Sequence, residues 1–224
     1  MVNETQASFS PPRERIITAF MSLLAEQPIE RIDLAEIAKR AEVSLADLRG
    51  EFSTTLAILA AHMKEIDRKV LRGGDGDMAQ EPARERLFDV LMRRLEAHAA
   101  HREAVRSLLR SAARNPPLAV ALNGLAVQSQ QWMLAAAAIP SSGPKGMVRA
   151  QGLALLYASV LRTWLDDTDP GLARTMAALD SALARGQRWS NLFDDLLSVP
   201  SRLCPARTRR RPRRDDAGEE TVAA

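Results

Sequence analysis

The sequence predicts an all-helical fold, with a small N-terminal unit of three helices followed by a larger helical bundle. Hydrophobic residues make up 46% of the 224 residues, which is ample for a core. Aromatic residues are only 4%, and β-branched residues are few beside Ala, Leu and Arg, a composition that favours helix. Apolar residues recur at spacings of three and four, and no run of alternating polar and apolar residues predicts a strand.

The most informative segment is residues 32–52. Its first half has apolar residues spaced as one face of a short helix. That pattern breaks at Ala41, and Ser44 is suited to be the N-cap of a second short helix. The inner faces are assigned to Ile32, Leu34, Ile37 and Ala38 in the first helix and to Leu45, Leu48 and Phe52 in the second. Two short helices joined by a tight turn predict a helix-turn-helix, whose second helix can lie in the major groove of DNA.

The stretch from residue 16 to residue 59 resembles the N-terminal domain of the TetR family of bacterial transcriptional regulators. The family's first-helix pattern is matched by Ile16, Ala19, Leu23, Ala25 and Glu26. Its helix-and-turn pattern is matched by Ile37, Ala38, Ala41, Val43 and Ser44, and its recognition helix by Leu48 and Phe52. The resemblance implies a TetR-like fold and a recognition helix that contacts operator DNA through Ser44, Leu45, Ala46, Asp47 and Arg49.

The recognition helix departs from that family's pattern on its exposed face. The family usually presents Thr, Tyr and His there, with a Lys just beyond, where this sequence has Asp47, Arg49, Glu51 and Thr55. In addition, Glu42 replaces the usual turn glycine. Asp47 and Glu51 would face a polyanion, although a carboxylate can also accept from cytosine N4. Arg49 is then the only residue on the exposed face of this helix that is a good hydrogen-bond donor to DNA.

Helix-breaking residues divide the chain into segments. We expect a flexible arm at 1–10, a helix-turn-helix domain at 11–55, a ligand-binding and dimerisation domain at 56–199 and a disordered Arg-rich tail at 200–224. Helices are expected from 56 to a Gly- and Asp-rich linker at 73, then from 82, and over about 101–114, 117–139 and 145–166. Asp169-Pro170 is read as the start of a last long helix that meets Gly186, with a short terminal helix over 189–199.

Residues 87–186 also resemble the lipid-binding proteins of coenzyme Q biosynthesis, which share the TetR-like fold. The likeness lies in residues 164–167, Trp-Leu-Asp-Asp, and residues 172–176, Leu-Ala-Arg-Thr-Met. Both resemblances imply a hydrophobic cavity in the body. They also imply a homodimer whose four-helix interface is built from residues 145–186, with small and apolar residues suited to that packing at Gly152, Ala154, Leu155, Ala158, Val160 and Leu183.

An apolar ligand site is expected between the long helices, the usual place for a pocket in a bundle. Its candidate residues are Trp132, Met133, Tyr157, Leu161 and Trp164. The alternative for each of them is ordinary core packing, because aromatic residues and Met routinely fill helix interfaces.

Charge is placed unevenly along the chain. The net charge is +3, but residues 202–214 hold seven Arg and no acid, and without them the balance is −4. The first 72 residues carry ten basic and eleven acidic residues. The basic pI therefore comes from the tail and does not indicate a nucleic-acid-binding surface on the fold. The tail itself could add attraction to DNA or anionic lipid without sequence readout.

Several classes of site and location are not indicated. Cys204 is the single cysteine, which excludes an internal disulfide and fits a reducing cytoplasm. No signal peptide is recognisable at the start, and no segment reaches the roughly 18–20 apolar residues of a membrane span, so we expect a soluble cytoplasmic protein without integral membrane association.

Catalytic, cofactor and metal sites are not predicted. Asp166, Asp167 and Asp169 are interpreted as helix caps and end charges rather than as catalytic carboxylates. His98 and His101 have a spacing that suits a metal, but no third ligand follows, so both are read as solvated residues at helix ends.

These observations lead to a preferred function and two alternatives. The preferred one is a ligand-responsive transcriptional repressor of the TetR type, in which an apolar effector or lipid changes the separation of two DNA-binding heads. The first alternative is a lipid- or prenyl-binding accessory protein with a degenerate DNA-binding head. The second is a dimeric protein-interaction module that binds neither ligand.

Overall fold

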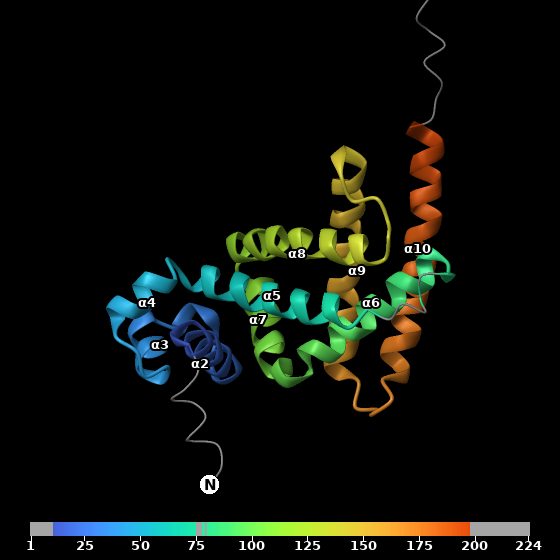
Figure 1. The fold of residues 1–224 in the computed structure, drawn as a ribbon. Helices are drawn as coiled ribbons and strands as arrows, with labels where there is room; N and C mark the ends of the chain where they lie inside the picture. Colours follow the sequence, from blue (N-terminus) through green and yellow to red (C-terminus); the bar gives the residue numbers. More distant parts are fainter. Residues whose placement is uncertain (1–10, 75–77, 79, 198–224) are drawn as a thin grey trace, which may run out of the picture.

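The computed structural model describes residues 11–74, 78 and 80–197, with side-chain environments as far as residue 186. In these residues all regular secondary structure is helical, which confirms the predicted all-α class (Figure 1). The head contains α2 (Pro12–Glu26), η1 (Ile29–Arg31), α3 (Leu34–Arg40) and α4 (Leu45–Glu51). The remaining helices are α5 (Thr55–Arg72), α6 (Ala83–His98), η3 (Ala99–His101), α7 (Arg102–Arg114), α8 (Pro116–Ala136), α9 (Gly143–Asp166) and α10 (Ala173–Leu197).

The head is a small bundle in which α2 packs against α3, α4 and α5. Each helix of the helix-turn-helix starts at a side-chain cap. Asp33 accepts from the Glu36 backbone N–H at 2.7 Å, and Ser44 caps α4 in the same way. The core of this bundle includes Ile16, Phe20, Leu23, Leu24, Ile37, Leu48 and Ile58.

Two of the predicted inner-face residues were assigned wrongly. Leu34 and Leu45 are both exposed, Leu45 to 56%. Each is the first residue after its N-cap, and in the first turn of each helix this side chain faces solvent rather than the head core. Leu48, one turn further along α4, is the residue that enters the core.

α5 belongs to both hydrophobic cores. Its first half places Ile58 and Leu59 in the head core, and its second half places Ile66 and Val70 in the body core. In Figure 1 this helix runs from the head toward α6, and α7 lies beside α2 on the way. Ala104 of α7 completes the head core. The head is therefore joined to the body by a continuous helix and by packing of α2 on α7.

The body is a bundle in which α8 packs on α9 and α9 on α10, with α6 in contact with α5, α8 and α10. Its core is largely Leu and Ala, and the largest side chain buried in it is Trp164. No helix of the described residues is long and apolar enough to cross a membrane.

The last helix differs from the prediction at both ends. α10 begins at Ala173, three residues later than predicted, although Asp169 does cap it by accepting from the Ala173 backbone N–H at 3.1 Å. The intervening turn carries Leu172 in the left-handed region at φ +52°. Buried Asp167 accepts from the backbone N–H and Oγ1 of Thr175 at 2.8 and 2.7 Å, so the interpretation of these acids as caps holds for both.

α10 also does not stop at Gly186 but continues to Leu197, so the helix expected over 189–199 is its continuation. A glycine inside a helix costs only about 1 kcal/mol, and this one lies against Leu156 of α9. The arm at 1–10, residues 198–199, the tail at 200–224 and Cys204 lie outside the described residues.

Candidate DNA-binding surface and ligand groove

The polar atoms at the start of α4 are used within the helix. The Ser44 hydroxyl accepts from the Asp47 backbone N–H at 3.0 Å. In return the Asp47 carboxylate accepts from the Ser44 backbone N–H at 3.2 Å and from its hydroxyl at 2.7 Å. These hydrogen bonds from Ser44 lower the pKa of the Asp47 carboxyl. Two of the predicted DNA contacts, Ser44 and Asp47, thus form a capping box.

The exposed face of α4 presents the other predicted contacts. Leu45, Ala46 and Arg49 are all exposed, and Arg49 has no ion-pair partner among the described residues. Glu51, in contrast, accepts from Arg13 of α2 at 3.2 Å, and the Arg13 guanidinium lies 4.5 Å from the centroid of the Phe52 ring. Arg49 is therefore an exposed cation of α4 whose guanidinium can contact another molecule.

The turn before α4 is held in an uncommon conformation. Glu42 has φ +53°, the region that favours glycine. Its carbonyl accepts from Arg15 of α2 at 3.1 Å. The positive φ at this position explains why the TetR family usually has a glycine where this chain has Glu42.

The predicted ligand residues do not share one cavity. Three of them are buried in the body core: Met133, Tyr157 and Trp164. Leu161 is half-buried and packs against the same core. Only Trp132 is open to solvent, with 56% of its surface exposed. Adjacent residues of a helix point about 100° apart, so Met133 faces the core while Trp132 faces outward.

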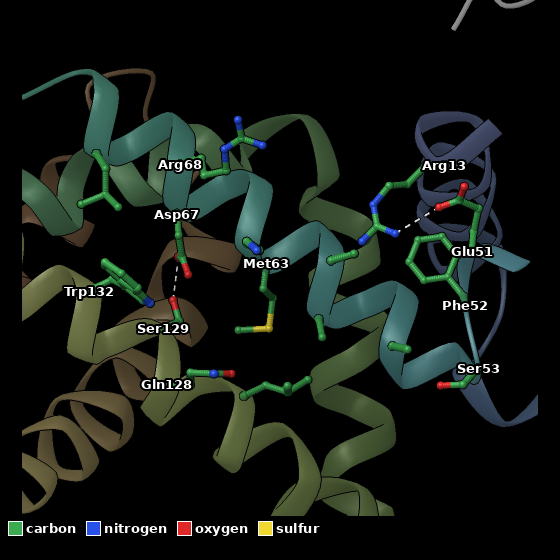
Figure 2. Close-up of a pocket in the computed structure, with 16 residues that line it drawn as sticks. Arg13, Glu51, Phe52, Ser53, Met63, Asp67, Arg68, Gln128, Ser129 and Trp132 are labelled. Atoms are coloured by element: carbon green, nitrogen blue, oxygen red, sulfur yellow. Dashed lines mark hydrogen bonds and ion pairs between the residues drawn. The ribbon is translucent and has the colours of Figure 1, made fainter. Parts of the chain in front are cut away.

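Trp132 instead lines a groove of about 670 Å³ between α5 and α8. Figure 2 shows Trp132 and Ser129 of α8 near one end, and the Arg13–Glu51 pair with Phe52 at the other. The volume falls within the roughly 300–1,000 Å³ common for small-molecule sites. One open groove is thus bounded by the body and by the C-terminal end of α4.

A buried polar network forms part of the groove wall. Asp67 of α5 makes an ion pair with Arg94 of α6, and Ser129 of α8 donates to Asp67 Oδ1 at 2.6 Å. The Arg94 guanidinium lies 5.4 Å from the centroid of the Tyr157 ring. Sequence reasoning missed this network. The available signal was an acid inside the otherwise apolar stripe of α5 that contains Ile66 and Val70.

The histidines are not solvated helix ends, and that interpretation was wrong. His62 and His98 are buried, and His101 is half-buried. The ring centroids of His62 and His101 are 4.7 Å apart, and those of His62 and His98 are 6.4 Å apart. Burial lowers the pKa of all three, that of His62 to about 4. In the described residues no group of three or more His, Cys, Asp or Glu is placed to hold a metal ion.

The face predicted to dimerise is only partly available. Ala154, Val160 and Leu183 are buried within the protomer core, so they cannot form an interface with a second copy. Gly152 and Leu155 of α9 are exposed, Leu155 to 62%. With Met147, Val148 and Met176, they leave apolar surface uncovered on α9 and α10.

Comparisons with known proteins connect this fold to one group of structures. No protein-family model matches the sequence, and no curated protein matches it either. Among solved structures, the chain is similar to a TetR transcriptional regulator from Nitrosomonas europaea ATCC 19718, with 22% identity over 80% of this chain and 99% of that chain and a TM-score of 0.62. A TetR regulator from Rhodococcus sp. RHA1 follows, with 19% identity, 82% and 97% coverage and a TM-score of 0.55.

A TetR-family regulator from Streptomyces coelicolor is similar with 17% identity, 83% and 84% coverage and a TM-score of 0.53. At these identities the likeness establishes the fold. The chain has a TetR-like fold over most of its length.

Proposed function

We propose that the protein is a DNA-binding transcriptional repressor of the TetR type, which acts as a homodimer and responds to an apolar ligand. The TetR-like fold supports this proposal, because it presents α4 as the second helix of a helix-turn-helix. A dimer would set two such helices about 34–36 Å apart, the spacing of successive major grooves.

The observation that carries the proposal is that the three charged residues of α4 differ in whether their side chains are paired. Arg49 is exposed and without an ion-pair partner, whereas Glu51 is paired with Arg13 and Asp47 is held by Ser44. The charge of Glu51 is thus compensated by Arg13 within the head, whereas Asp47 stays ionised and its carboxylate accepts hydrogen bonds from Ser44. An arginine free to donate can contact phosphate or guanine in the major groove.

The groove between α5 and α8 offers a route for ligand response. Glu51 and Phe52, at the end of the recognition helix, line the same groove as Ser129 and Trp132 of the body. A ligand that fills it would contact both parts at once, so its binding free energy would depend on how the head sits on the body. By linkage, DNA binding and ligand binding would then influence each other.

The test of DNA binding is a salt-stepped titration of the full-length protein with the DNA upstream of its own gene and with an unrelated duplex of equal length. Preference for the upstream DNA at physiological salt is expected. Arg49→Ala should weaken that preference by about tenfold or more, since a good base contact contributes about 1–3 kcal/mol. Arg72→Ala removes an equal charge from the far end of α5 and should change affinity much less.

A lipid- or prenyl-binding accessory protein is the second candidate. It is favoured by the exposed Trp132 in an open groove and by a head whose acids and bases nearly balance. Under this alternative the two duplexes would bind equally, and salt would abolish both interactions. Such a result would assign the attraction to the Arg-rich tail and overturn the regulator proposal.

A further inference from the structure

We infer that the groove between α5 and α8 binds an apolar chain that ends in an anionic head group, such as a carboxylate. This inference deepens the ligand response proposed above and rests on it for its regulatory meaning. The direct binding that it predicts, however, requires no DNA. It follows from the shape of the groove and from the pairing of the charges that line it.

Residue size on one face of α5 shapes the groove. Ala57, Ala60 and Ala61 line its head end, where a side chain of one carbon leaves open space. Further along, Met63 of α5 and Trp132 of α8 give the groove broad apolar surfaces. Figure 2 shows Met63 between the two labelled ends of the groove. An elongated apolar chain fits this shape, because it can lie along α5 and be covered by α8.

The acids of the groove already have partners. Asp67 is bound by Arg94 and Ser129, and Glu51 is bound by Arg13. A cationic ligand would have to compete with these arginines for a carboxylate. The Asp67 pair is largely buried, so breaking it would leave a buried charge without compensation. The groove is therefore poorly suited to a cationic head group.

Two cations of the groove have no such partner. Lys64 and Arg68 are exposed, line the groove, and make no ion pair with any described residue. They are four residues apart on α5, so they are neighbours on the same face of the helix. Two like charges at this spacing repel each other slightly, and an anion held between them would relieve that repulsion. The groove thus combines apolar walls with two cations at its edge that make no ion pair among the described residues; Glu65 of the same helix interacts with Arg68 only at longer range.

Three probes with the same chain and different head groups test this inference. Dodecanoate, dodecan-1-ol and dodecylammonium would be titrated into the full-length protein without DNA, below their aggregation limits, by calorimetry and tryptophan fluorescence. We expect dodecanoate to bind at least tenfold more tightly than either of the others. Trp132→Phe should keep binding by calorimetry while removing most of the fluorescence change. Equal affinity for the three probes, or no binding of dodecanoate, would overturn the inference.

A pair of matched double variants locates the head group. Lys64→Gln with Arg68→Gln should weaken dodecanoate binding at least tenfold and leave dodecan-1-ol unchanged. Lys69→Gln with Arg72→Gln makes the same charge change on the same helix outside the groove lining, and it should have little effect. If both pairs weaken binding equally, or neither does, the anion is not held in the groove.

The two proposals fail in different ways. Dodecanoate binding that depends on Lys64 and Arg68, in a protein that ignores its upstream DNA, would keep the groove and remove the regulator. Specific DNA binding without any head-group preference would support the regulator proposal and overturn the inference of an anionic ligand in the groove.

Discussion

Arg94 and Asp67 form an ion pair inside the body that ties α6 to α5. The side chain of Arg94 is 2% exposed and that of Asp67 is 10% exposed, so both charges are largely removed from water. Ser129 adds a hydrogen bond from α8, which makes the pair a junction of three helices. Asp67 also lines the groove between α5 and α8, so this junction connects the groove wall with the core.

Arg94→Met should destabilise the fold by about 3–5 kcal/mol, because it leaves the Asp67 carboxylate buried without its partner. Replacing both residues, as Arg94→Met with Asp67→Leu, should recover most of that loss. Chemical denaturation at a fixed protomer concentration would measure both. Arg40→Met breaks an exposed ion pair with Glu26 and serves as the control, with a much smaller effect expected. A loss as small for Arg94 as for Arg40 would contradict the structural role of the buried pair.

The histidine cluster should make stability depend on pH. Burial lowers the pKa of His62 from 6.5 to about 4. Between these pH values the His62 side chain is protonated in the unfolded chain but neutral in the folded protein. Its contribution is complete above pH 6.5 and is lost as pH falls toward 4, by about 2 kcal/mol between pH 7.5 and 5. His98 and His101, lowered in the same direction, add to this loss.

His62→Leu should flatten that dependence by removing one of the titrating groups while keeping an apolar side chain in the core. The free energy of unfolding would be measured for both proteins at pH 7.5 and pH 5. If the free energy of unfolding changes as much between these pH values in the variant as in the original protein, His62 is not responsible for the pH dependence.

Some features could be predicted from the sequence because they depend on neighbouring residues. A helix start is set by a few adjacent residues, so Ser44 and the Pro-containing breaks located most helices within a few residues. The start at Asp169-Pro170 was placed too early because Asp169 reaches over a turn to cap Ala173. That turn requires φ +52° at Leu172, which no local preference would suggest for a bulky residue.

The candidate sites were harder to predict because they depend on contacts between distant segments. Trp132 and Met133 are adjacent and both apolar, yet only the packing of α8 decides which one faces the core. His62 lies 39 positions before His101, so their contact is invisible to any spacing rule. The groove likewise joins α5 to α8, and the pairing of Asp67 with Arg94 follows from the tertiary fold.

Glu42→Gly should raise stability by roughly 0.5–1 kcal/mol. Glu42 has φ +53°, where a side chain costs about 1–2 kcal/mol and glycine costs nothing, against a larger loss of chain entropy for glycine. Thermal or chemical denaturation would measure the difference. Glu42→Ala removes the same charge but keeps a Cβ at positive φ, so it should not stabilise. Equal gains for both variants would point to the charge rather than to the backbone.

Leu155→Glu should dissociate the proposed dimer. Leu155 is a large apolar residue on the outer face of α9, 62% exposed in the single chain. In a symmetric dimer through residues 145–186 the substitution would introduce two charges into the interface, and burying unpaired charges is costly. Sedimentation equilibrium should show a dissociation constant raised at least tenfold. Val120→Glu places the same charge on α8 at a residue 74% exposed and should leave association unchanged. If the two variants associate equally well, the α9 face is not the interface.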